Sequence, residues 1–393
     1  MTGSPDTMQA QPGYSLWQIV RYMLALGTWG FGGPVALAGY MYRDLVERRR
    51  WISEGEYKEG MALAQLMPGP LAAQLAIYLG FVHYRLVGAT LVGLAFVLPS
   101  FVMVVAIGAV YKAFGGIAWM QAVFYGVGAA VIGIIAMSAF KLTTKNIGKD
   151  KLLWLIFLAS AAVTVITKSE IVWVFLGAGI LVWLVRAPPG RPSGDTLNSV
   201  AAPLAAFFAL DALDWHKLGQ IGAFFAYAGS FVFGSGLAIV PFLYGGVVQE
   251  HHWLTDRQFV DAVAVAMITP GPVVITTAFV GYLVSGFWGA SVAAAATFIP
   301  CYLFTVLPAP YFKKHGKRPG IVAFVDGVTA AAIGAISGAA IVIGEQSVTD
   351  LPTALLALAT LAVLWRFKKV PEPVVVLVAA AAGLLLYPVA MHP

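Results

Sequence analysis

Two Pro-Gly-Pro triplets, at residues 68–70 and 270–272, interrupt apolar segments of this chain at an offset of 202 residues. Proline removes a backbone donor and clashes with the preceding helical turn, so a helix that reaches either triplet has to end there. Farther along, Pro99 and Pro300 match at an offset of 201, which implies one deleted residue. We therefore predict that the chain is a tandem duplication of one structural unit.

The composition predicts that lipid is the solvent for most of the surface. Hydrophobic residues make up 60% of the 393 residues, charged residues make up 11%, and the mean hydropathy is +0.84. Soluble domains are closer to half apolar and a quarter charged. The single cysteine, Cys301, excludes an intramolecular disulfide. We predict an all-α polytopic membrane protein.

The repeat divides the chain into predicted regions. We predict a disordered tail over 1–13, a first repeat over 14–190, a linker with an additional membrane crossing over 191–216, and a second repeat over 217–393. Each repeat has two interrupted apolar segments and then four plainer spans. The predicted segments are 15–47, 59–84, 86–111, 117–140, 151–167 and 170–186, and then 219–248, 261–284, 286–311, 320–343, 351–366 and 373–390.

The interrupted segments have two interpretations. Each is a re-entrant hairpin of two half-helices, or each is a continuous span with a kink, which membrane helices tolerate. With hairpins and the additional crossing, the only basic residues outside the cytoplasm are Lys112, Lys168, Lys217 and Arg257. The positive-inside rule favours that arrangement. It makes the two repeats inverted, with the N-terminus cytoplasmic and the C-terminus outside, a recurring plan of secondary transporters.

The breaks are the predicted substrate site, because non-helical backbone at membrane depth is tolerated only where protein buries it or where it lines a cavity. Each break starts a half-helix whose first N–H groups lack an intrahelical partner and favour an anion. The alternative is that small residues there only permit close helix packing. The residues predicted to bind a small oxyanion are Gly30, Gly32, Gly33, Gln65, Pro68, Gly69, Pro70, Gln74, Ser230, Gly234, Ser235, Thr269, Pro270, Gly271, Pro272 and Thr276, with Thr28 and Thr277 as further neutral donors nearby.

Three acidic residues lie within or beside apolar segments. Asp326 is the candidate coupling residue, because an acid within a span is a functional hypothesis by default. The alternative is an interfacial carboxylate near Lys317 and Arg318. Glu59 and Asp261 occupy equivalent positions, and we interpret them as helix N-terminal residues that complement the dipole rather than as proton carriers.

Signals for other kinds of chemistry are weak. His251 and His252 are adjacent, whereas two histidines on one helix face need a spacing of three or four to share a metal. The chain has neither a Walker A lysine motif nor a nucleophile elbow. The basic residues sit in short loops between apolar runs, so the net charge of +6 does not indicate a nucleic acid partner. We predict no metal, no cofactor and no enzymatic activity.

The motifs at the breaks resemble those of the chromate transporter family in its two-domain, long-chain form. They are Gly-Phe-Gly-Gly-Pro at 30–34, Ala-Gln-Leu-Met-Pro-Gly-Pro at 64–70, Phe-Gly-Ser-Gly at 233–236 and Thr-Pro-Gly-Pro at 269–272. The resemblance covers nearly the whole chain. It implies an inner-membrane exporter of chromate in a bacterium or archaeon, driven by the electrochemical gradient and conferring chromate resistance, with sulfate as a competitor. Ser235-Gly236 departs from Gly33-Pro34 of the first repeat.

Other functions stay open at this point. A sulfate or related oxyanion importer or exchanger would use the same scaffold, because the two dianions share charge and shape. A membrane-embedded enzyme or assembly scaffold would need a catalytic constellation that the sequence does not contain. A channel is disfavoured because no short ring-forming motif is present. A homodimer is left open.

Overall fold

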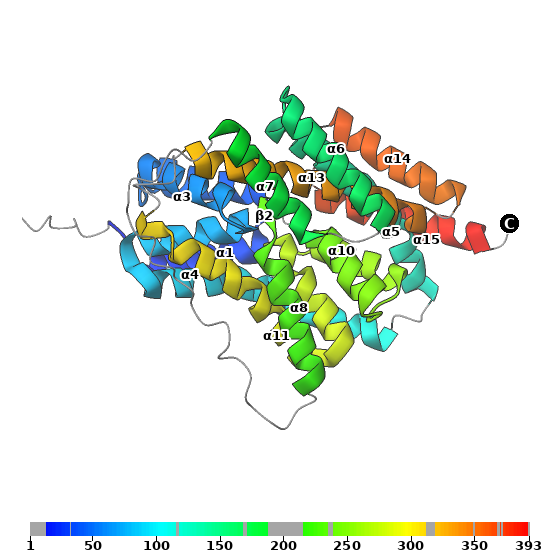
Figure 1. The fold of residues 1–393 in the computed structure, drawn as a ribbon. Helices are drawn as coiled ribbons and strands as arrows, with labels where there is room; N and C mark the ends of the chain where they lie inside the picture. Colours follow the sequence, from blue (N-terminus) through cyan, green and yellow to red (C-terminus); the bar gives the residue numbers. More distant parts are fainter. Residues whose placement is uncertain are drawn as a thin grey trace, which may run out of the picture.

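The computed structural model describes residues 13–31, 33–114, 118–167, 171–187, 215–234, 239–311, 319–348, 350–367, 370 and 372–391. Helices make up nearly all of these ranges (Figure 1). The prediction of an all-α membrane protein is confirmed. The predicted tail, apart from Gly13, and the predicted crossing near 197–213 lie outside the described residues.

The two repeats have the same order of α- and π-helices, but the short strand lies at the second break of the first repeat and at the first break of the second. The first contains α1 (Leu16–Trp29), α2 (Gly33–Met41), η1 (Tyr42–Arg48), α3 (Glu54–Leu66), β1 (Gly69–Pro70), α4 (Leu71–Phe114), α5 (Ala118–Asn146), α6 (Lys151–Thr167) and α7 (Val172–Arg186). The second contains α8 (Trp215–Ser230), β2 (Phe233–Gly234), α9 (Ile239–Leu243), η4 (Tyr244–Glu250), α10 (Asp256–Ile268), η5 (Val273–Ile275), α11 (Thr276–Val306), α13 (Pro319–Ser347), α14 (Leu351–Arg366) and α15 (Glu372–Met391).

The chain folds back on itself at the breaks. Tyr22 of α1 donates its hydroxyl to the carbonyl of Tyr40 in α2, 3.1 Å away. Glu56 of α3 lies 3.2 Å from the His83 ring nitrogen in α4. The members of each pair are nearly equidistant in sequence from the break between them, so the helices on either side run antiparallel. The two breaks of the first repeat are therefore hairpin turns and not kinks in continuous spans.

A further reversal divides each of the two longest helices. Arg85 in α4 has φ 51°, and Gly286 in α11 has φ 61° at the equivalent position. A Cβ atom built on Gly80 would lie 2.5 Å from the carbonyl oxygen of Gly88. Residues eight apart in a straight helix are about 12 Å apart, so the chain turns back between them. The predicted boundary between 84 and 86 is confirmed.

The first helix of the second hairpin begins five residues before its predicted start in both repeats: α3 begins at Glu54 and not at 59, and α10 begins at Asp256 and not at 261. Ser53 accepts a hydrogen bond from the Glu56 backbone, and the Glu56 carboxylate accepts one from the Ser53 backbone. Thr255 and Gln258 form the same capping box at the start of α10. Reciprocal capping satisfies otherwise unpaired backbone donors, so each helix extends to its box.

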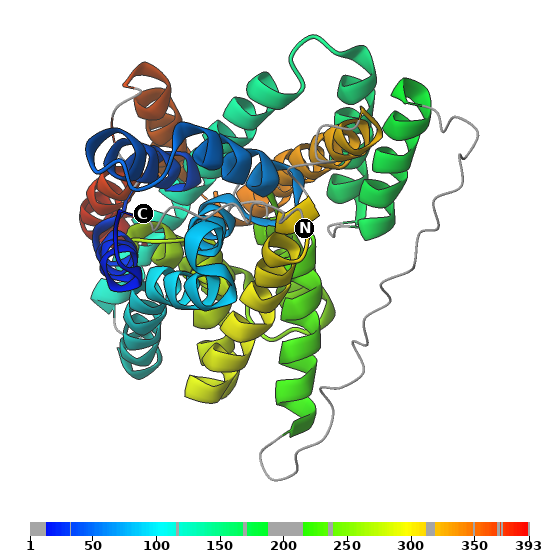
Figure 2. The same cartoon turned by 90° about the vertical axis from the view of Figure 1, so that its left-hand side faces the viewer.

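The repeats are interlocked rather than placed side by side. Helix α5 of the first repeat packs on α14 and α15 of the second, and α13 of the second packs on α6 and α7 of the first (Figures 1 and 2). Small residues allow these contacts: Gly126 faces the backbone of Ala379, and its counterpart Gly327 faces the backbone of Ala178. Neither repeat can therefore form this helical packing alone.

The outer surface is suited to lipid. Four helical stretches of the described chain are long and apolar enough to cross a membrane: Leu71–Phe114, Trp119–Thr144, Val273–Tyr311 and Pro319–Glu345. Large apolar side chains such as Ile166 and Leu385 are 80% and 76% exposed. Exposure on this scale is unfavourable in water and expected against hydrocarbon.

Candidate functional site

The four breaks meet as two crossed pairs at the centre of the fold. Gly69, in the first triplet, donates its backbone N–H to the carbonyl of Val232, 2.5 Å away in the other repeat. Gly271, in the second triplet, donates to the carbonyl of Gly30, 3.0 Å away. The two bonds are equivalent under the offset of 202. Reciprocal exchange of this kind is the signature of a two-fold relation, here between the halves of one chain.

This pairing changes the expected role of the central glycines. We expected N–H groups at the breaks to be available to a ligand, but those of Gly69 and Gly271 are bonded to protein. The two residues have φ values of 142° and 96°, which favour glycine because it lacks a Cβ atom. Backbone donors for a ligand would therefore come from the first turn after each triplet, starting at Leu71 and Val273.

Two buried side chains that lie outside the triplets donate hydrogen bonds to them. Gln74 donates its amide to the carbonyl of Pro68 at 2.8 Å, and Ser100 donates its hydroxyl to the carbonyl of Pro270 at 2.7 Å. Both side chains are fully buried. Gln74 was among the predicted site residues, whereas Ser100 was not. Its position directly after the repeat landmark Pro99 was the available signal.

Most of the predicted hydroxyl donors bond to their own helix. Donation to a carbonyl three or four residues earlier leaves only lone pairs facing outward. The hydroxyls that do this belong to Thr28, Ser230, Thr269 and Thr276. Gln65 is exposed near the end of α3. In this conformation the four hydroxyl hydrogens are directed to backbone carbonyls.

Two polar atoms beside the triplets are buried without a hydrogen-bond partner among the described residues. They are Oε1 of Gln74 and Oγ1 of Thr277, each on a side chain with no exposed surface. Buried polar atoms normally find partners, and leaving one unpaired costs roughly 1–3 kcal/mol. Each follows a Pro-Gly-Pro triplet by a few residues, so both are suited to contact a ligand or a water there.

The remaining predicted residues frame the breaks. Gly33 begins α2, and Gly234 pairs with Pro70 in the short parallel ladder of β1 and β2. Pro272 precedes the three-residue 3₁₀ turn η5. Gly32 and Ser235 lie outside the described residues.

Asp326 lies in a polar cluster away from the breaks. Its carboxylate accepts a hydrogen bond from Arg186 at 2.8 Å, and Arg186 also contacts Asp150 in the turn between α5 and α6. The side chain of Asp326 is 41% exposed. The backbone N–H of Leu153 and then the charge of Arg186 hold the pKa of Asp150 below its usual value. The sequence alternative placed Lys317 and Arg318 near Asp326, and these two lie outside the described residues.

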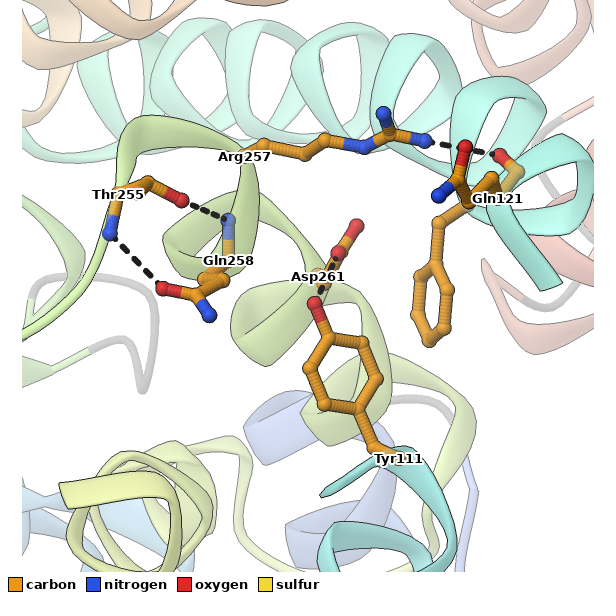
Figure 3. A pocket seen from close by; sticks show the side chains of 7 residues that line it. Tyr111, Gln121, Thr255, Arg257, Gln258 and Asp261 are labelled. Atoms are coloured by element: carbon orange, nitrogen blue, oxygen red, sulfur yellow. Dashed lines mark hydrogen bonds between the residues drawn. The ribbon is translucent and has the colours of Figure 1, made fainter. Parts of the chain in front are cut away.

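A second polar site surrounds Asp261. This carboxylate is 3% exposed and accepts a hydrogen bond from the Tyr111 hydroxyl at 2.7 Å. The two side chains line a cavity of about 190 Å³. Figure 3 shows them pointing toward each other. The cavity is lined by Tyr111, Gln121, Phe124, Thr255, Arg257, Gln258 and Asp261. Asp261 is not in the first turn of α10, where Asp256 complements the dipole, so its interpretation as a helix N-terminal residue was wrong.

Comparison with known proteins gives one consistent family. The chromate transporter family matches residues 17–183 and 219–384. The chain is 68% identical over 395 residues to the chromate transport protein of Cupriavidus metallidurans, covering 99% of this chain and 98% of that protein. It is 60% identical over 391 residues to a probable chromate transport protein of Synechococcus elongatus, covering 98% and 100%. Identity to the chromate transport protein of Pseudomonas aeruginosa is 31% over 400 residues, covering 97% and 95%. No solved structure matches.

Proposed function

Because this chain belongs to the chromate transporter family, we propose that it exports chromate from the cytoplasm across the inner membrane, driven by the electrochemical gradient, and so confers chromate resistance. The observation that carries the proposal is the crossed pairing of the four breaks, which gathers helix N-termini from both repeats at one place. Helix N-termini attract anions through their free N–H groups and their dipole.

The proposed substrate site lies after the two triplets. Backbone donors from the first turns of α4 and η5 would bind the oxyanion, and the Thr277 hydroxyl would donate to it. The amide of Gln74 would position the first triplet through Pro68, as Ser100 positions the second through Pro270. Neutral donors suit a transporter, which has to release its cargo as well as bind it.

The two-fold relation supports alternating access. In inverted-repeat transporters the two halves exchange conformations around a central site. Here the equivalent hydrogen bonds from Gly69 and Gly271 cross between the repeats. Breaking one bond while keeping the other would open the substrate site to one side of the membrane only. The departure at Ser235-Gly236 makes the first hairpins unequal, which would let the two sides respond differently. The inverted membrane orientation and cytoplasmic N-terminus belong to this proposal.

The test uses purified protein in liposomes with labelled chromate, with a pH gradient and a membrane potential imposed separately. We expect transport by the unmodified protein and competition by sulfate. Thr277→Val removes a donor while keeping the shape, and should raise the KM for chromate by up to about tenfold, the value of one hydrogen bond. Thr143→Val, in a buried hydroxyl that donates to Ala139 on α5, is the matched control.

Three results would contradict parts of the proposal. Unchanged KM in the Thr277→Val variant would remove Thr277 from the site. Sulfate transport without chromate transport would favour the alternative, a sulfate or related oxyanion carrier on the same scaffold. Uptake rather than extrusion under physiological gradients would reverse the direction.

A further inference from the structure

Asp261 is a buried acid that the proposed substrate site does not use. It lies in the middle of α10, and its hydrogen-bond donor, Tyr111, belongs to α4 of the other repeat. The Tyr111 ring is held edge-on against Phe124 and Phe279, with ring centres 5.3 and 5.6 Å away. The hydrogen bond between Tyr111 and Asp261 therefore links the two repeats.

The groups facing Asp261 come from several helices. Tyr111 comes from α4, and Arg257 comes from α10 itself and donates to the backbone carbonyl of Gln121 in α5 at 3.3 Å. The side chain of Gln121 accepts a hydrogen bond from Tyr387 of α15 at 2.9 Å. Of the residues that line the cavity, Asp261 is the only acid and Arg257 the only base.

The side chains around Asp261 are better suited to binding a proton than to binding a metal ion. A divalent cation needs several oxygen ligands and usually more than one carboxylate. The described part of the chain has no group of three or more acidic, histidine or cysteine side chains that could hold a metal. The neighbouring guanidinium of Arg257 would also repel a cation. A single carboxylate can bind a proton without any other ligand.

Both protonation states of Asp261 are supported by its surroundings. Burial favours the neutral acid, whereas the hydroxyl of Tyr111 and the charge of Arg257 favour the carboxylate. A group that carries protons needs this balance, because it has to bind and release within one cycle. The cavity provides the path, since Thr255, Arg257 and Gln258, which lie on its wall, are at the exposed start of α10 (Figure 3).

Helix α10 joins Asp261 to the break. Asp261 precedes Thr269 by eight residues, or about 12 Å of helix. The triplet at 270–272 follows directly, and its Gly271 is bonded to Gly30. The equivalent acid, Glu59, interacts with Tyr78 of its own repeat, whereas Asp261 accepts its hydrogen bond from the other repeat.

We propose that Asp261 binds and releases a proton. Its protonation state controls the hydrogen bond that links α10 to Tyr111 of α4, and thereby couples proton movement to oxyanion transport. The carboxylate takes one proton from cavity water and later returns it to water, with no other reactant. The coupling half of this proposal rests on the proposed transport function, whereas the proton-binding half does not.

The first experiment needs no chromate. Infrared difference spectra of the purified full chain, recorded between high and low pH, should show the carbonyl band of a buried carboxylic acid. Asp261→Asn should remove that band, and Tyr111→Phe should change the pH at which it appears. Asp256→Asn is the matched control, because Asp256 also lies on α10, accepts a hydrogen bond from the hydroxyl of Tyr244 in η4 and does not line the cavity.

A band that persists unchanged in Asp261→Asn overturns the proposal, as does its absence from the unmodified protein. Both results are independent of whether the protein transports chromate. A thermal unfolding profile within a few degrees of the unmodified protein would establish that the variant is folded.

The second experiment separates coupling from substrate binding. Liposomes with the unmodified chain should show faster labelled chromate flux when a pH gradient is imposed at zero membrane potential. Asp261→Asn should lose this acceleration while its chromate-for-chromate exchange at equal pH changes by less than about threefold. Asp256→Asn should retain both. Retained acceleration in Asp261→Asn overturns the coupling, and loss of exchange in that variant would reassign Asp261 to substrate binding. Absence of exchange in the unmodified protein would contradict the transport function instead.

Discussion

Gly271 donates its backbone N–H to the carbonyl oxygen of Gly30, and this 3.0 Å bond joins the Pro-Gly-Pro triplet of the second repeat to the glycine break of the first. The equivalent bond from Gly69 to Val232 runs the opposite way between the repeats. Both donors would be unpaired in an isolated repeat, because each lies outside a helix. Duplication therefore supplies the partners that let broken backbone stay buried.

We expect Gly271→Ala to destabilise the protein by roughly 1–3 kcal/mol, because its φ of 96° is unfavourable for alanine and the new Cβ would clash with Ser100 Oγ. Adding Ser100→Ala should restore only part of the loss, since it removes the clashing atom but leaves the strained φ and also removes the hydrogen bond to Pro270. Thermal unfolding in detergent measures both effects. Gly148→Ala, at a φ of 56° with open space around it, controls for strain alone. Equal destabilisation by Gly271→Ala and Gly148→Ala would contradict the explanation by a clash with Ser100.

The turn within α4 depends on close contact between two glycines. Gly88→Ala would place a Cβ against the Gly80 carbonyl, so we expect a loss of roughly 1–3 kcal/mol from overpacking. Gly289→Ala should behave alike, because Gly281 and Gly289 repeat the contact in α11. Gly39→Ala, in α2 with open space, should be neutral or slightly stabilising. The free energy of unfolding of all three variants tests this, and a harmless Gly88→Ala would argue against a tight hairpin.

Thr277→Val should stabilise the protein without substrate while weakening chromate binding. The hydroxyl it removes is buried and has no partner among the described residues, so its loss relieves a penalty of roughly 1–3 kcal/mol. Melting temperature with and without chromate measures both parts, since a bound ligand raises stability. A variant that is less stable in both conditions would indicate a partner for this hydroxyl within the protein.

The cluster of Asp150, Arg186 and Asp326 should contribute only weakly at neutral pH. All three side chains are about one-third exposed or more, so Arg186→Gln should cost less than about 1 kcal/mol and the difference should shrink in high salt. The pKa of Asp150 is below its ordinary 3.8, so its contribution to stability is present above that pH and is lost as the pH falls through the lower folded value. Asp150→Asn should flatten this part of the acid unfolding curve, and an unchanged curve would contradict the assignment.

The sequence alone determined the membrane class, the duplication and the positions of the breaks. These follow from local properties: an apolar composition needs lipid, a Pro-Gly-Pro triplet ends a helix, and a repeated landmark keeps its offset. The starts of α3 and α10 could also have been read from their capping boxes, Ser53–Glu56 and Thr255–Gln258, because those signals are local too.

Only the tertiary structure decided which break meets which. The offset equates Gly69 with Gly271, but it does not say that each would bond to the first break of the other repeat. The same holds for Asp261, whose partner Tyr111 is 150 residues away in the other repeat. Its position nine residues before a triplet was visible in the sequence, but its burial, its donor and its cavity come from helices packed across the two-fold relation. Contacts between distant segments depend on how the repeats interlock, and no local pattern in either repeat encodes that arrangement.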